Sequence, residues 1–152
     1  VYKRQKLYRL IMISNQKEVR RFFAQIWQKR CIGHLSPMEE RVLKIIVAHP
    51  EYTPYLENIE EYIHKEWHAD NSEHNPFLHL SLHLSLQEQV AIDQPRGIAA
   101  IHQKLSEQKG SAIEAEHVMM GPLTEMIWKA QKYHTGLDVT SYLEALRVLA
   151  YR

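Results

Sequence analysis

The chain has 152 residues, 45% hydrophobic and 24% charged, with a formal net charge of +1. This is about one domain's worth of chain with enough apolar residues for a core, which excludes an intrinsically disordered protein. The single cysteine, Cys31, excludes an internal disulfide and a multi-cysteine zinc site, and the widely spaced glycines exclude GxGxxG, Walker-type and GxSxG motifs.

Residues 1–12 are expected to form a basic N-terminal extension, with a short amphipathic helix over 2–12. The apolar run Leu10–Ile13 is too short for a secretory signal, and no run approaches the roughly 20 apolar residues of a membrane span. Together with the single cysteine, this predicts a cytoplasmic protein. Residues 13–152 are expected to form the folded domain.

Charge is unevenly distributed along the chain. Residues 1–30 hold nine basic residues and one acid, a balance of 9 − 1 = +8, whereas the remainder holds 10 basic and 17 acidic residues, 10 − 17 = −7. One interpretation is internal neutralisation by the acidic stretch Glu51–Glu73. The other is a surface that binds an acidic protein partner or nucleic acid, and its predicted residues are Lys3, Arg4, Lys6, Arg9, Arg20 and Arg21.

Helix signals dominate the first half of the folded part. Asn15 followed by Glu18 predicts a capped helix to about Arg30, and Ser36-Pro37-x-Glu39 predicts a second start with a capping box. That second helix should end at His49-Pro50. Shorter helical turns are expected over 54–68, and a loop over 69–74.

The segment that begins at Asn75-Pro76 has leucines at every second position from 78 to 86, which is the pattern of a strand. Its length, its capped start with proline and the loss of alternation after residue 86 favour a helix instead. We therefore predict a central helix over about 76–93, apolar almost all round. Gln94-Pro95 should end it.

Three further helices are expected after Gly97. They cover 98–109, a long segment from Ser111 to about Tyr133 that starts with Ser111-x-x-Glu114, and 139–149. No partner strand is evident. The predicted fold is an all-α, single-domain bundle of five to six helices around the central apolar helix.

Five segments between about Ile13 and Leu149 can be taken together, namely VRRFF, HPEY, NPFLHLSLHLSLQEQ, IDQPRGI and EMIWKAQ. They resemble the motifs of a family of small bacterial proteins known only as a domain of unknown function. The resemblance implies a compact helical protein. It carries no established activity and transfers no catalytic residues, and it places residues 1–12 ahead of the expected start.

Ten histidines in one chain make metal binding the leading functional hypothesis. His79 and His83 stand at i and i+4 on the central helix, and Glu114 and His117 at i and i+3 on the long helix, so that each pair shares one helix face. If the two pairs converge, His79, His83 and His117 supply nitrogens and Glu114 a carboxylate to zinc, iron or nickel. The expected chemistry is metal-assisted activation of water, although whether the protein is an enzyme stays open.

A purely structural interpretation competes with this hypothesis. His79 and His83 could be core histidines that are hydrogen-bonded to carboxylates such as Glu114 or Glu125, and Glu114 could act only in its capping box. His49 is expected to be a solvated loop residue. The sequence defines neither a substrate nor an oligomeric state.

Overall fold

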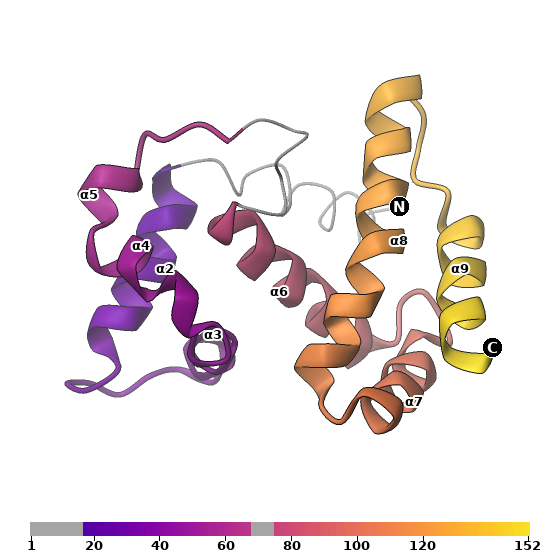
Figure 1. Ribbon diagram of the computed structural model, residues 1–152, viewed down its shortest axis with the longest axis horizontal. Helices are drawn as coiled ribbons and strands as arrows, with labels where there is room; N and C mark the ends of the chain where they lie inside the picture. The colour runs from indigo at the N-terminus through magenta and orange to yellow at the C-terminus, as the bar shows by residue number, and fades with distance from the viewer. Residues whose placement is uncertain (1–16, 68–74) are drawn as a thin grey trace. The chain divides into compact units, whose positions relative to one another are not determined.

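The computed structural model describes residues 17–67 and 75–152, and within these ranges the regular structure is entirely helical (Figure 1). This confirms the predicted all-α class. The chain divides into two compact units, one within residues 9–84 and one that contains residues 85–152. We call them the N-terminal unit and the C-terminal unit. The predicted helix over 2–12, the cap at Asn15 and the loop over 69–74 lie outside the described residues.

The N-terminal unit is built from two medium helices and three short ones. They are α2 (Lys17–Lys29), α3 (Pro37–Val47), the 3₁₀ turn η2 (Pro50–Tyr52), α4 (Thr53–Glu57) and α5 (Ile59–Tyr62). The predicted capping box of α3 is present, because the Ser36 hydroxyl accepts from the Glu39 N–H and the Glu39 carboxylate accepts from the Ser36 N–H. The helix ends before His49-Pro50, as expected from the restriction that proline places on its predecessor.

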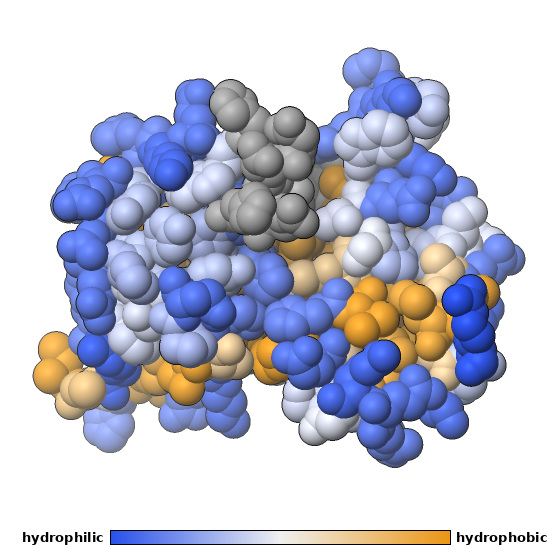
Figure 2. Space-filling model, in the orientation of Figure 1, coloured by the Kyte–Doolittle hydropathy of each residue, from blue (hydrophilic) through white to orange (hydrophobic). Residues whose placement is uncertain are grey.

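The core of this unit forms between α2, α3 and α4. Phe23 and Ile26 of α2 are buried with Ile46 of α3 and Leu56 of α4. Large hydrophobic side chains also remain exposed, among them Ile32, Met38 and Val47. Figure 2 shows hydrophobic side chains along the edge of the unit near α3, beside an otherwise hydrophilic face.

Helix α6 (Pro76–Ile92) confirms the central helix and its helical interpretation. The buried Asn75 side chain caps it, because its Oδ1 accepts from the N–H groups of Phe77 and Leu78. Residues 75–84 of this segment belong to the N-terminal unit and residues 85–92 to the C-terminal unit. A single helix therefore contributes to both cores.

The C-terminal unit contains α7 (Ile98–Lys109), α8 (Ala112–Tyr133) and α9 (Val139–Tyr151), which pack against one another (Figure 1). Gly97 and Gly110 bound α7 with φ angles of 102° and 95°, a region in which residues with a Cβ are strained. Pro122 lies inside the continuous helix α8. No described helix combines the length and apolar character needed to cross a membrane.

Candidate metal centre

His79 and His83 project from the same side of α6, as their spacing predicts. Their ring centroids are 5.0 Å apart, His83 is fully buried and His79 is half-buried. Both rings meet a third imidazole, that of His49, whose centroid lies 4.8 Å from each of them. The N-terminal unit thus holds a cluster of three histidines, which we call the histidine triad (His49, His79, His83).

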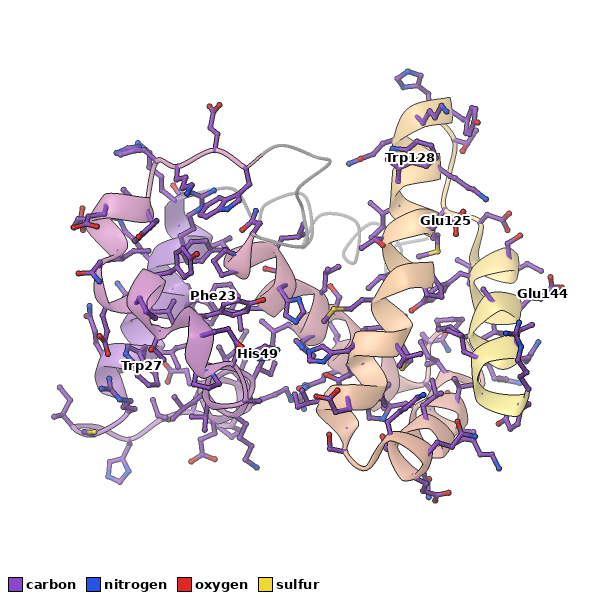
Figure 3. All side chains as sticks on the ribbon, viewed as in Figure 1. Phe23, Trp27, His49, Glu125, Trp128 and Glu144 are labelled. Carbon is purple, nitrogen blue, oxygen red and sulfur yellow. The ribbon has the colours of Figure 1, made fainter. Side chains whose placement is uncertain are left out.

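The expectation that His49 is a solvated loop residue was wrong. His49 follows the end of α3 and is only 4% exposed (labelled in Figure 3). A sequence signal for this burial exists, because Val42, Ile45, Ile46 and His49 follow the i, i+3, i+4, i+7 spacing of an inward helix face. The adjacent Pro50 correctly predicts the end of the helix, but it carries no information on which side chains of that end are buried.

The hydrogen bond at the far side of the His49 ring fixes which of its nitrogens carries the proton. Nδ1 lies 2.7 Å from the backbone oxygen of Ile45, and since a carbonyl can only accept, Nδ1 must donate. In the neutral ring Nε2 then carries the lone pair. A histidine that binds a metal usually has this arrangement, with its second nitrogen donating to a carbonyl or carboxylate.

Two other imidazole nitrogens approach the lone pair of His49. The Nε2 atoms of His79 and His83 lie 3.1 and 3.2 Å from Nε2 of His49. One lone pair in the plane of the ring cannot accept two N–H groups with good geometry. Convergence of three such atoms is therefore poorly explained by hydrogen bonds among neutral histidines alone.

The same separations fit ligands of one small ion. Two nitrogens that each bind zinc at about 2.0–2.1 Å with tetrahedral angles lie roughly 3.3 Å apart. The three histidines each offer a ring nitrogen within 4.8 Å of the others, which is close enough for one ion to collect them after small side-chain rotations. The triad therefore has the composition and spacing of a three-nitrogen metal site.

Tyr52 forms a wall of the triad. Its ring stacks on that of His49, with centroids 5.3 Å apart and planes inclined by 4°, and it meets the ring of His79 edge-on at 5.6 Å. Burial, together with the negative charge of Glu51, raises the pKa of the Tyr52 phenol to about 12. The phenol is consequently neutral at physiological pH, and it restricts how the His49 ring can turn.

Glu114 and His117, the second predicted pair, lie on α8 in the C-terminal unit. The Glu114 carboxylate is 3.5 Å from Nδ1 of His117, and its side chain is 59% exposed. The Ser111 hydroxyl accepts from the Glu114 N–H, which confirms the predicted helix start. That this pair joins His79 and His83 on one ion stays a prediction.

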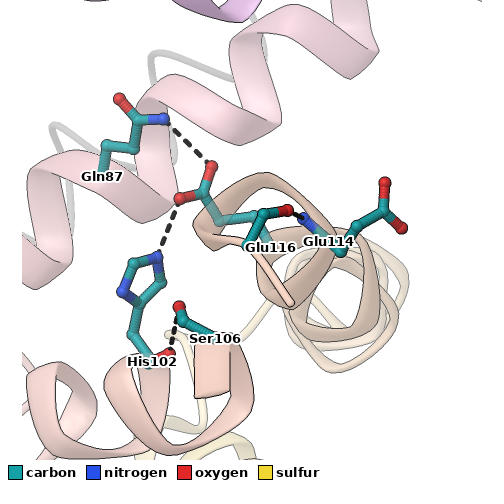
Figure 4. Close-up of polar contacts among 6 residues, drawn as sticks. Gln87, His102, Ser106, Glu114 and Glu116 are labelled. Atoms are coloured by element: carbon teal, nitrogen blue, oxygen red, sulfur yellow. Dashed lines mark hydrogen bonds and ion pairs between the residues drawn. The ribbon is translucent and has the colours of Figure 1, made fainter. Parts of the chain in front are cut away.

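The buried carboxylate of the C-terminal unit belongs to Glu116, which sequence reasoning missed (Figure 4). Its Oε1 accepts from Nε2 of Gln87 at 3.0 Å, and its Oε2 lies 2.8 Å from Nε2 of His102. The helical stripe formed by Glu116 with Met119, Met120 and Leu123 could have revealed its inward position. The capping-box spacing pointed to Glu114 instead.

Glu125 is the second carboxylate that the structural interpretation names as a hydrogen-bond partner for core histidines. Its side chain is 64% exposed, and the carboxylate lies 3.4 Å from Nζ of Lys129. Figure 3 shows it on α8, one turn before the exposed Trp128. Glu125 is therefore a surface residue of α8.

The predicted binding residues of the basic segment differ in what the structure shows. Lys3, Arg4, Lys6 and Arg9 lie outside the described residues. Arg20 is 2% exposed, and its Nη1 donates to the backbone oxygens of Tyr62, Ile63 and Lys65 at 2.8, 3.2 and 2.7 Å, at and just after the end of α5. Arg21 is exposed and pairs with Glu60 at 2.8 Å. The Arg21–Glu60 pair is the kind of contact that internal neutralisation predicts. Arg20 instead donates to neutral backbone carbonyls, which gives it a structural role.

The chain belongs to the family described as "Domain of unknown function (DUF1841)", whose family model matches residues 15–148. This span agrees with the extent of the resemblance seen in the sequence motifs, and it includes the whole histidine triad. Neither a curated protein nor a solved structure matches the chain.

Proposed function

We propose that this member of the DUF1841 family binds a divalent transition-metal ion, namely zinc, iron or nickel, through His49, His79 and His83. The observation that carries the proposal is the approach of two imidazole Nε2 atoms to within 3.1 and 3.2 Å of a third. Imidazole nitrogen is a good ligand for all three metals. The ring of His49 is held for this role by its bond to the Ile45 carbonyl.

Three protein nitrogens leave one position of a tetrahedral ion for a water molecule or a substrate. That ligand number is typical of catalytic zinc sites, whereas structural sites have four protein ligands. An ion held in this way lowers the pKa of its bound water towards neutrality and so generates a hydroxide nucleophile. The reaction class that the triad supports is therefore metal-assisted activation of water.

The test is metal binding by the full chain. Protein purified without chelators is analysed for zinc, iron and nickel, then stripped and titrated with each metal by calorimetry. We expect one ion per chain and a loss of at least 100-fold in affinity for His49→Ala and for His83→Ala. The matched control is His64→Ala, because His64 is an exposed histidine of the same unit and should leave affinity unchanged.

Two results would contradict the proposal. One is stripped protein that binds none of the three metals; the other is an affinity that responds equally to His64→Ala and His49→Ala, which would indicate adventitious binding. The predicted contributions of Glu114 and His117 are measured in the same titration. If either residue is a ligand, its alanine variant should lower the metal affinity by at least tenfold. If neither variant lowers the affinity, the triad alone forms the site.

A further inference from the structure

The charge of the proposed site points to the kind of molecule that occupies its open position. We infer that the metal held by the histidine triad binds anionic oxygen ligands, so that the natural ligand or substrate presents a carboxylate or a phosphate group to the ion. This inference rests on the proposed function and adds the chemical class of the exogenous ligand.

The first step concerns the charge that the triad leaves on a bound ion. His49 donates through Nδ1 to the Ile45 carbonyl, so that it can coordinate only through Nε2 and does so as a neutral imidazole. His79 and His83 also approach through Nε2 and are neutral ligands in their ordinary metal-binding form. An ion bound by these three nitrogens keeps its formal charge of +2.

The second step concerns the surroundings of that charge. His83 is 0% and His49 4% exposed, the ring of Tyr52 covers one face of His49, and the neighbours of His83 on α6 include the buried Leu80 and Leu82. A net charge of +2 among such buried side chains is costly unless opposite charge accompanies it at the ion. An anion at the open position supplies that charge, and a neutral ligand does not.

Hydroxide formed from bound water is the smallest such anion, and it competes with carboxylate and phosphate for the same position. Added anions should therefore bind best below the pKa of the bound water. Above that pKa their affinity should fall by roughly tenfold for each pH unit, because hydroxide then occupies the ion.

The experiment uses the full chain loaded with cobalt(II), whose visible spectrum reports changes among its ligands. The loaded protein is titrated with azide, acetate and inorganic phosphate, with perchlorate as a weakly coordinating control at the same ionic strength. We expect saturable spectral changes with the three coordinating anions and none with perchlorate. The response to acetate relative to phosphate tells a carboxylate site from a phosphate site, and His64→Ala should behave as the wild type does.

The outcomes separate the two proposals. If cobalt binds stoichiometrically but its spectrum ignores acetate and phosphate, the inference is overturned, whether or not azide binds, and the proposed metal site stands. Binding of anions that does not weaken at high pH would also overturn it, because the anions would then occupy a place other than the open position. If the stripped protein binds neither cobalt nor any of zinc, iron and nickel, the proposed function falls and the inference falls with it.

Discussion

His49 in the N-terminal unit and His102 in the C-terminal unit are both largely enclosed, but their ring nitrogens face different partners. Nε2 of His102 lies 2.8 Å from a carboxylate oxygen of the buried Glu116, whose other oxygen accepts from Gln87. Nε2 of His49 faces two further imidazoles. The first arrangement matches a donor with an acceptor, and the second brings two further ring nitrogens to the one lone pair of His49.

This difference shows how a structural histidine can be told from a candidate ligand. A histidine bonded to a buried carboxylate, the arrangement that the competing interpretation expects for His79 and His83, occurs in this molecule around His102. Burial alone does not distinguish the two, because His49 is 4% exposed and the side chain of His102 only 15%. The identity of the facing atoms does.

The largest expected effect comes from removing the carboxylate of Glu116, which joins Gln87 and His102 in the C-terminal unit. We call these three residues the Glu116 cluster. Glu116→Ala leaves Nε2 of His102 and the amide of Gln87 without their buried acceptor, and we expect the free energy of unfolding to fall by about 3 kcal/mol. Chemical denaturation measures it. Since this cluster is structural, the loss should be equal with and without added zinc; a loss seen only with zinc would assign Glu116 to the metal site.

The next effect comes from the ion itself. Zinc at 100 times its dissociation constant should stabilise the stripped wild type by about 2.7 kcal/mol, because only the folded chain presents the triad. The melting temperature should rise accordingly for the wild type and for His102→Ala, and it should not rise for His49→Ala. Stabilisation that persists in His49→Ala would refute the contrast between the two clusters.

A smaller effect is expected at Tyr142, a buried residue of α9 whose hydroxyl donates to Oε1 of Gln89 at 2.8 Å. Tyr142→Phe leaves that oxygen without this donor and should cost about 1–2 kcal/mol at pH 7, measured by denaturation. Burial also raises the pKa of the phenol. The stability that this neutral phenol contributes is complete below its unfolded pKa of about 10 and declines as pH rises above it.

The phenylalanine variant should therefore lose less stability than the wild type between about pH 10 and 11.5. The raised pKa of Tyr52 acts in the same direction, so Tyr52→Phe serves as the comparison. Equal alkaline losses in the wild type and Tyr142→Phe would show that Tyr142 is not held neutral by burial.

The smallest effect is expected at the surface. Arg21 and Glu60 form an exposed pair, and exposed pairs contribute little because water and salt screen them. Arg21→Ala should leave the melting temperature and zinc affinity essentially unchanged.

If the basic segment binds nucleic acid, the same variant should weaken binding to polyanions and flatten its salt dependence, which a fluorescence titration at several salt concentrations measures.

Most of the secondary structure could be predicted because its signals are local. Ser36 and Ser111 mark helix starts through side-chain contacts within four residues, and Gly110 marks an end through its own backbone conformation. In α6 the length and the cap predict the helix correctly, whereas the alternation of leucines is typical of a strand. The division of the chain into two compact units has no comparable local sequence signal, because the boundary falls inside α6.

The candidate site was predicted in part for the same reason. His79 and His83 are neighbours on one helix, so spacing alone places them together. His49 is 79 − 49 = 30 positions earlier in the chain, and its approach depends on how α3 packs against α6. Glu116 was missed because a local capping rule outweighed the inward stripe of α8. Contacts distant in sequence require the tertiary packing that local rules do not contain.

Helix α6 carries two residues of the triad in its first half and two amide side chains of the C-terminal unit, Gln87 and Gln89, in its second half. A cut in the chain that separated the units would fall inside one continuous hydrogen-bonded helix. Neither unit can therefore be inherited or recombined as an independent module unless it takes the whole of α6 with it. Each residue inserted within the helix would rotate the side chains after it by about 100° relative to those before it, and would so change which side chains of α6 share a face.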